Sequence, residues 1–306
     1  MIEVQNLSRA YGDLLAVDDV SFNIQSGEIV GLLGHNGAGK TTIMKMLSGY
    51  LEPSSGRIHI DGLDLAEESL KVQSQLGYLP ENLPVYPDMT VADYLHYAAT
   101  LKGLAGEALT QSVKRVLLDT ELLGKLLQPI ATLSRGYKQR VGVAQAMLGS
   151  PNLLIMDEPT NGLDPKQTQH MRELIQALAQ NATVILSTHI MQEVDAICDR
   201  AIILRDGRLA LDEKLSTLRR PGSLLIKTNL TASRVQEVIP QMLVTGDGKN
   251  CRIALQDGTN IDQTAANIAS AIASAGGQLY HLAPEIRDLE SVFREASEEG
   301  GVDRAA

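Results

Sequence analysis

The sequence predicts an α/β protein with a mostly parallel β-sheet, joined to a smaller α+β domain on its C-terminal side. Up to about residue 218, short apolar runs rich in β-forming residues alternate with helix-like segments. This alternation is typical of parallel sheets that carry helices on both faces. After "RRPG" at residues 219–222, a second series of strand and helix patterns begins. The break predicts a domain boundary at that point.

Five apolar runs predict the strands of the parallel sheet, and each is short enough to be a buried strand. They are Ile29–Leu33, Leu76–Leu79, Leu153–Met156, Thr183–Ser187 and Ala201–Leu204. Helices are expected between most of them, with clear patterns over Lys40–Ser48, Gly136–Leu148 and Pro165–Ala179.

The region that begins at Met89 differs, because helix patterns follow one another there without an intervening strand. Thr90 and Asp93 match the capping box that begins the first of these helices. We therefore expect a helical insert over about residues 89–150, within a first domain of residues 1–219.

The region from Ser223 has its own order of elements. Its patterns predict a strand, a helix, two strands around Gly246–Gly248, a helix and a strand, followed by a last helix over Asp288–Ala296. A β-α-β-β-α-β order is typical of the ferredoxin-like fold. We expect a ferredoxin-like α+β domain over residues 223–299 and a frayed tail over residues 300–306.

The composition fits a globular protein and argues against some classes of function. The 306 residues carry a net charge of −10, whereas a protein that coats nucleic acid needs a basic surface. Cys198 and Cys251 lie far apart without metal-ligand spacing, which indicates reduced thiols. No apolar run approaches the roughly 18–20 residues that cross a bilayer, and no signal peptide is visible.

Residues 31–42 read "GLLGHNGAGKTT" and match the phosphate-binding pattern G-x-x-x-x-G-K-[ST] through Gly34, Gly39, Lys40 and Thr41. Glycines let the backbone approach a ligand, so that N–H groups of the loop and of the next helix converge on phosphate oxygens. Lys40 would reach the β- and γ-phosphates, and the Thr41 hydroxyl would bind Mg²⁺. The alternative is a glycine-rich turn that happens to precede a helix.

Two adjacent carboxylates, Asp157 and Glu158, end the apolar run of "LLIMDEPTNGLDP". Neighbouring side chains on a strand point in different directions, so one could hold Mg²⁺ through water while the other faces a nucleophile. Ligands bind at the carboxyl ends of strands in open α/β sheets. The alternative is an ordinary solvated strand end. His189 ends another predicted strand and would reach the same edge, although a lone histidine is usually structural or exposed.

The stretch "LSRGYKQR", Leu133–Arg140, resembles the signature sequence of ATP-binding-cassette (ABC) proteins. Its place between the phosphate loop and the Asp157–Glu158 pair is also that of the family. From Met1 to about Leu218, the chain is identified as a member of the ABC nucleotide-binding domains. The resemblance implies a phosphate-loop NTPase fold with a helical insert, ATP and Mg²⁺ as ligands, and ATP hydrolysis.

The resemblance also implies residue roles. Glu158 resembles the general base that polarises the attacking water, His189 resembles the switch histidine that contacts the γ-phosphate, and Lys40 stabilises charge. Asp157 and Thr41 would hold Mg²⁺. The residues that would bind nucleotide are Tyr11, stacked on adenine, and Gly34, His35, Asn36, Gly37, Ala38, Gly39, Lys40, Thr41 and Thr42.

Other matching residues imply a second subunit. The signature residues Ser134, Arg135, Gly136 and Tyr137 would bind the nucleotide held by a second copy, and Asp164 would cross to that copy. Three positions depart from the usual pattern: Arg135 replaces a glycine, Tyr137 a glutamine, and Glu81 the glutamine that normally touches Mg²⁺ and water. Glu81 could still bind Mg²⁺ or lie at a partner interface. The three departures are familiar in the ABC-2-type exporter branch.

The resemblance thus implies an ATPase subunit that dimerises head to tail on two ATP molecules and drives a separate membrane permease, with export as the expected direction of transport. It would lie at the cytoplasmic face of the cell membrane. The permease would dock near Glu81–Tyr97, although Tyr94 and Tyr97 could simply be packed in the insert. The alternative is a soluble ABC ATPase acting on a nucleic-acid or ribosomal partner, but no nucleic acid is expected. The C-terminal domain would either pack on its copy or sense a ligand.

Overall fold

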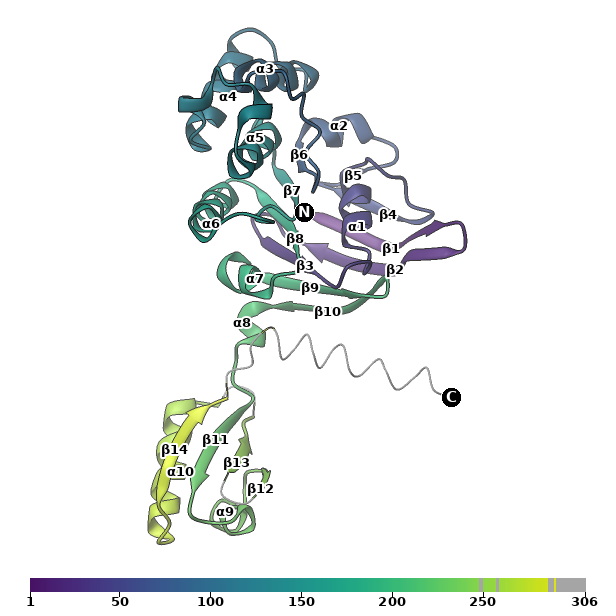
Figure 1. Ribbon diagram of the computed structural model, residues 1–306. Coiled ribbons are helices and arrows are strands. Elements are labelled where there is room, and N and C mark those ends of the chain that lie inside the picture. The colour runs from purple at the N-terminus through teal and green to yellow at the C-terminus, as the bar shows by residue number, and fades with distance from the viewer. Residues whose placement is uncertain (248–249, 257–258, 286–288, 290–306) are drawn as a thin grey trace. The chain divides into compact units, whose positions relative to one another are not determined.

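The computed structural model describes residues 1–247, 250–256, 259–285 and 289. The described chain forms two compact units, the first of residues 1–215 and the second of the described residues from 216 onward. Each unit has its own sheets and core (Figure 1).

A six-stranded sheet with the order β10-β9-β3-β8-β7-β6 forms the centre of the first unit. The strands from β9 to β6 are parallel, and β10 pairs antiparallel at one edge. All five predicted strands are observed, because continuous apolar runs are what a strand buried on both faces requires. The bounds are β3 (Ile29–Leu33), β6 (Leu76–Leu79), β7 (Leu153–Asp157), β8 (Thr183–Thr188), β9 (Arg200–Arg205) and β10 (Arg208–Lys214).

A second sheet of the first unit is antiparallel and has the order β2-β1-β4-β5. The predicted strands do not include it. Along β1 only some side chains are buried, and polar residues occupy the others, so the sheet lacks the continuous apolar runs that identify a central strand. Its strands are β1 (Ile2–Tyr11), β2 (Leu14–Ile24), β4 (Ser55–Ile60) and β5 (Leu63–Asp64).

Helix α1 (Lys40–Leu47) joins the two sheets, because its apolar side chains share one core with strands of both. Helices α6 (Pro165–Ala179) and α7 (Met191–Ile197) pack against the other face of the six-stranded sheet (Figure 1). The sheet is therefore covered on both faces, and its carboxyl edge is the part open to ligands. Two short helices complete the unit and the link to the second, α2 (Ser69–Ser74) and α8 (Leu215–Leu218).

Helices dominate the chain between β6 and β7. They are α3 (Val91–Leu101), α4 (Gly106–Asp119) and α5 (Arg135–Met147), with two 3₁₀ turns at Leu123–Lys125 and Ile130–Thr132. The predicted cap of α3 is observed, since the Thr90 hydroxyl oxygen accepts a hydrogen bond from the Asp93 N–H.

The second unit contains β11 (Ser223–Thr228), α9 (Ala232–Val238), β12 (Val244–Asp247), β13 (Asn250–Ala254), α10 (Ile261–Ser274) and β14 (Leu279–Pro284). Its sheet has the order β12-β13-β11-β14, with all neighbours antiparallel. Apolar residues of β11 and β13 pack against α9 and α10. The predicted last helix, Asp288–Ala296, and the predicted tail lie outside the described residues except for Leu289.

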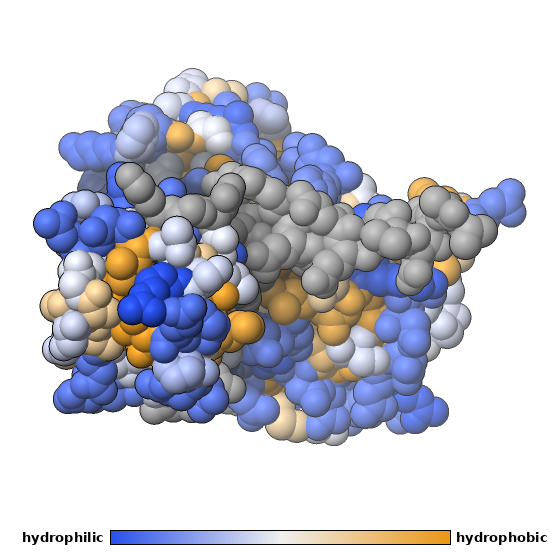
Figure 2. All heavy atoms as spheres, turned by 90° about the horizontal axis from the view of Figure 1, so that it is seen from below, coloured by the Kyte–Doolittle hydropathy of each residue, from blue (hydrophilic) through white to orange (hydrophobic). Residues whose placement is uncertain are grey.

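In the part of the chain that the structure describes, every helix is too short or too polar to cross a membrane. Where Figure 2 colours the surface, hydrophilic residues surround several hydrophobic patches.

Candidate active site

The glycine-rich loop connects the carboxyl end of β3 to the first turn of α1. Gly39 has a φ of +101°, and a Cβ at this position would lie 2.7 Å from the Ala16 carbonyl oxygen. Only glycine fits both the dihedral angle and the space. Within the loop, Gly34 and Ala38 are buried, whereas His35, Asn36 and Gly37 are exposed; Thr41 and Thr42 are half-buried on α1. The loop therefore presents its tip, which includes Gly37, to solvent, whereas Gly34 and Gly39 are buried against the protein.

Lys40 is 7% exposed, and its ammonium lies within the loop. Nζ donates to the carbonyl oxygens of Gly34 at 2.7 Å and His35 at 3.2 Å. Burial lowers the pKa of Lys40, while the carboxylates of Glu158, Asp157 and, more weakly, Glu81 act in the opposite direction. The sheet edge thus brings a cation and the predicted acidic residues into mutual electrostatic range.

Asp157 is the last residue of β7 and is 1% exposed. The Ser187 hydroxyl on β8 donates to its Oδ1. Oδ2 is buried and has no hydrogen-bond partner among the described residues. Buried polar atoms in native proteins are nearly always paired, and an unpaired one indicates a bound ion or water. The unpaired Oδ2 of Asp157 is therefore suited to bind Mg²⁺ or a water of its hydration shell.

Glu158 follows with a φ of +52°, a backbone conformation that costs a residue other than glycine about 1–3 kcal/mol. Its N–H group donates to the carbonyl and hydroxyl oxygens of Ser187 at 3.2 and 3.1 Å. Both carboxylate oxygens lie 3.0 Å from Nδ1 of His189, which follows β8. Strain of this kind concentrates at functional sites, where the surrounding structure holds the residue in place.

Asp157 and Thr41 line one cavity of about 890 Å³ together with Glu81. Over the described residues, no group of three or more His, Cys, Asp or Glu side chains is arranged to hold a metal ion. Mg²⁺ usually keeps several waters and binds through one or two carboxylates plus substrate phosphates. The donor set found here fits a magnesium ion that arrives with a nucleotide better than a permanent metal centre.

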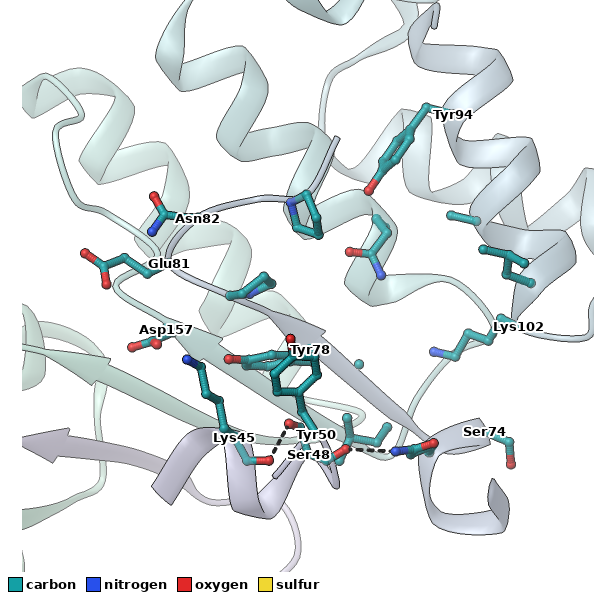
Figure 3. A pocket seen from close by; sticks show the side chains of 18 of the residues that line it. Lys45, Ser48, Tyr50, Ser74, Tyr78, Glu81, Asn82, Tyr94, Lys102 and Asp157 are labelled. Atoms are coloured by element: carbon teal, nitrogen blue, oxygen red, sulfur yellow. Dashed lines mark hydrogen bonds between the residues drawn. The ribbon is translucent and has the colours of Figure 1, made fainter. Parts of the chain in front are cut away.

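The same cavity continues away from Asp157 into an aromatic groove (Figure 3). Tyr50 and Tyr78 lie beside the acidic end, and Tyr94 and Lys102 lie at the other end. Burial raises the pKa of Tyr94 to about 12, and that side chain belongs to the core of the helical region. Tyr97, which also lines the groove, is exposed and packs edge to face on Tyr86. Tyr94 is therefore packed in the insert, as one of the two interpretations expects, whereas a docking role for Tyr97 stays a prediction.

The signature residues lie elsewhere. Ser134 is the N-cap of α5, and within the described chain its side chain makes no capping hydrogen bond. A Cβ at Gly136 would lie 2.5 Å from Oε1 of Gln167 on α6. The Tyr137 ring lies 5.2 Å from the Lys125 ammonium. Of the described residues that line the cavity, none belongs to residues 134–137. The structure therefore does not bring the signature residues into the site of their own chain.

Two other predicted residues have partners within the chain. Asp164 caps α6, since its Oδ1 accepts from the Gln167 N–H at 2.9 Å. Tyr11 is 45% exposed at the end of β1, and the Arg9 guanidinium lies 5.0 Å from its ring centre. One face of the ring is thus covered by a cation. Tyr11 is also not one of the described residues that line the cavity.

Ser187 is a residue of the site that sequence reasoning missed. It contacts both Asp157 and Glu158, and its position in "STH" two residues before His189 gave a signal. In a parallel pair, the ends of β7 and β8 are in register, with Asp157 opposite Ser187. Thr160 and Glu193, which form a buried hydrogen bond, were also missed, and no sequence pattern identifies their contact.

Comparisons with known proteins agree with this geometry. A family model described as "ABC transporter" matches residues 17–161. The uncharacterized ABC transporter ATP-binding protein YdbJ of Bacillus subtilis (strain 168) is 34% identical over an alignment of 306 residues. The alignment covers 97% of this chain and 95% of that protein. The linearmycin resistance ATP-binding protein LnrL of the same organism is 35% identical over 239 residues, 78% of this chain and 76% of that protein.

A solved structure supports the fold. The dimeric structure of a post-hydrolysis state of the ATP-binding cassette MJ0796, bound to ADP and Pi, is 26% identical to this chain with a TM-score of 0.65. The match covers 70% of this chain and 99% of that one.

Proposed function

The chain belongs to the family of ABC transporter ATP-binding proteins, which hydrolyse ATP, and we propose that it is the motor subunit of an ABC-2-type exporter. It would pair with a second copy of itself and drive a separate integral-membrane permease. The observation that carries the proposal is the sheet edge, where Asp157 and Glu158 lie within electrostatic range of the loop-bound Lys40. The resistance function named for LnrL supports the direction of transport.

Lys40 and the loop would bind the phosphates of ATP. The Lys40 ammonium donates to two carbonyl oxygens, and a phosphate oxygen is a stronger acceptor because it is charged. We expect the ammonium to turn to the nucleotide, next to the N–H groups of residues 34–42 and the N-terminus of α1. Tyr11 would then stack on adenine with its face opposite Arg9.

Glu158 is proposed as the general base for the attacking water. Its carboxylate is the acceptor that takes the water proton, and the His189 Nδ1 at 3.0 Å fixes its orientation. His189 is half-exposed, so its other ring nitrogen is free to face the γ-phosphate. Phosphoryl transfer depends mainly on such positioning and on charge stabilisation.

Thr41 and Asp157 would hold Mg²⁺, with Glu81 as a further oxygen in the same cavity. The ion neutralises charge on the β- and γ-phosphates when it is bound. Chelation of Mg²⁺ by EDTA is therefore expected to abolish hydrolysis, and added Mg²⁺ to restore it.

The signature residues Ser134, Arg135, Gly136 and Tyr137 would bind the nucleotide of the partner copy. The uncapped N-terminus of α5 supports this proposal, because such a helix end attracts anions. Two sites would then form between two head-to-tail copies, each with an Asp164 near the other. The dimeric cassette among the similar structures supports the arrangement.

We assign residues 1–219 to the nucleotide-binding domain, with the helical insert at about 89–150, and residues 223–299 to an accessory domain of ferredoxin-like fold. The β-α-β-β-α-β order and the antiparallel order β12-β13-β11-β14 support that fold. The accessory domain would pack on its copy. The motor would bind the cytoplasmic face of the membrane through the permease, which would dock in the aromatic groove.

The test of the ATPase site is Glu158→Gln beside the matched control Glu173→Gln, an exposed glutamate on α6. We expect Glu158→Gln to keep ATP affinity, to lose turnover by roughly two or more orders of magnitude, and to form a dimer with ATP in gel filtration. The control should match the wild type in all three. Wild-type turnover in Glu158→Gln would refute the assignment of the base.

The test of the transporter assignment uses Glu158→Gln with ATP as bait in detergent-solubilised native membranes. Enrichment of a polytopic membrane protein, read by mass spectrometry, is the expected result. Ribosomal or nucleic-acid-binding proteins in its place would favour the non-transport ATPase.

A further inference from the structure

Thr160 and Glu193 form a buried polar contact that has no part in the roles proposed above. Thr160 lies in the loop between β7 and α6, and Glu193 lies in the first turn of α7. Each is only 4% exposed. The Thr160 hydroxyl donates a hydrogen bond to Glu193 Oε2.

This contact is costly to maintain. Burial raises the pKa of Glu193, the nearby Glu158 carboxylate adds to that effect, and the Thr160 hydroxyl, Arg172 and His189 oppose it. Buried polar pairs can often be replaced by apolar pairs of similar shape with little loss of stability. Stability alone therefore gives a weak reason for a buried carboxylate at this position.

The contact joins the two segments that carry the reacting side chains. Thr160 follows Glu158 by two residues, and Glu193 follows His189 by four. At the other end of the loop, the Glu158 N–H group is held by Ser187. The Thr160–Glu193 bond is a second anchor of the loop, on the far side of Glu158.

We propose that the Thr160–Glu193 hydrogen bond is a positioning device, which sets the Glu158 carboxylate against His189 for ATP hydrolysis. Thr160 and Glu193 do not touch the reacting atoms; they act through the loop and through α7. The inference rests on the proposed roles of Glu158 and His189. Without the bond, the loop would lose its hydrogen bond to α7 next to Glu158. A displacement of about 1 Å at a reacting group can cost on the order of 100-fold in rate.

The first test compares Thr160→Val with Thr160→Ser. Valine has the shape of threonine without the hydroxyl, whereas serine keeps the donor. We expect Thr160→Val to lower kcat by roughly 10- to 100-fold, with the KM for ATP changed by less than about threefold. Thr160→Ser should restore kcat.

Thr120→Val is the matched control. Thr120 is 1% exposed, and its hydroxyl donates to the Val116 carbonyl oxygen at 2.6 Å in α4. This control also removes a buried hydroxyl, so its melting temperature should fall by a similar amount, but its kcat should stay at the wild-type value. A Thr160→Val variant that loses stability like the control and keeps its kcat would overturn the proposal.

A second pair of variants keeps the proposal testable if Thr160→Val does not fold. Glu193→Gln keeps an acceptor oxygen at the same reach, whereas Glu193→Asp keeps the charge and withdraws the oxygens by one methylene. Positioning predicts that Glu193→Asp lowers kcat by roughly tenfold or more and that Glu193→Gln stays within about threefold. The reverse order would show that the charge matters instead, and would refute the proposal.

Glu158→Gln is assayed in the same series to separate the two levels of inference. If Glu158→Gln loses turnover while Thr160→Val and Glu193→Asp keep it, only the positioning role fails. If Glu158→Gln keeps turnover, the proposed base itself is wrong.

Discussion

The six-stranded sheet of the first unit and the four-stranded sheet of the second are both built from alternating strands and helices, but they place the ends of their strands differently. In the first sheet, β3, β8 and β7 are parallel neighbours, so the glycine-rich loop, His189 and the Asp157–Glu158 pair meet at one edge. In the second sheet, all neighbours are antiparallel, so successive strand ends alternate between opposite edges. Parallel pairing thus gathers polar strand ends, and antiparallel pairing separates them.

The two units also differ in what their glycines do. Gly39 in the first unit has a positive φ and is crowded by the backbone at Ala16. Gly276 in the second unit has a φ of +74°, yet a Cβ there would meet no described atom within 4 Å beyond its chain neighbours. Gly39 allows two backbone segments to approach each other closely, whereas Gly276 only provides the positive φ that its turn requires.

The largest effect in this comparison is expected for Lys40→Ala, because it removes the charge at the parallel edge. Hydrogen bonds to charged groups are worth about 1.5–3 kcal/mol, so the affinity for ATP should fall by roughly 10- to 100-fold. Titration with a fluorescent ATP analogue measures it. Lys114→Ala, on the exposed surface of α4, is the control and should bind normally. An unchanged affinity for ATP in Lys40→Ala would refute the proposal that this loop binds the phosphates.

A smaller effect separates the two glycines. In Gly39→Ala, the new Cβ lies 2.7 Å from the Ala16 oxygen, so the loop must shift. We expect a loss of stability of about 1–3 kcal/mol together with weaker ATP binding. Gly276→Ala has room but keeps the positive φ, so about 1 kcal/mol and normal ATP binding are expected. Urea denaturation and ATP titration of both variants check this, and equal effects on binding would contradict the comparison.

The elements that could be predicted from the sequence are those whose signal is local. The strands β3, β7 and β8 are continuous apolar runs, and the residues at their ends are polar and adjacent in sequence. The parallel arrangement then places these residues at one edge without further information. The same reasoning could not find β1 and β2, which are partly exposed and mix polar with apolar residues.

Contacts between distant segments could not be predicted. Thr160 and Glu193 are 33 residues apart, and their meeting depends on how α6 and α7 pack on the sheet. The unpaired Oδ2 of Asp157 is likewise a property of the folded site. The predicted role of Ser134 and Gly136 depends on a second copy, so a single chain gives no geometry for it, and that role stays a prediction.

The last effect appears only on a change of pH, and it tests whether the two units unfold separately. Burial lowers the pKa of Lys102 to about 8, and its ammonium donates to the Leu148 carbonyl oxygen in the first unit. In the unfolded chain this lysine keeps its proton up to its ordinary value of about 10.4. Between these values the unfolded state binds more protons, so the free energy of unfolding rises with pH. Below pH 8 the full cost of burying the ammonium remains.

Lys102→Met should lack this rise. Because the side chain is partly exposed, we expect a difference of about 1–2 kcal/mol between pH 7.5 and 10. Each unit holds one buried thiol, Cys198 in the first and Cys251 in the second, so thiol labelling in urea reports on each unit. The wild-type and Lys102→Met midpoints for Cys198 should diverge as the pH rises, while those for Cys251 coincide. Equal divergence at both thiols would mean that the two units unfold as one. The two units would then differ in their strand pairing and in the site, but not in when they unfold.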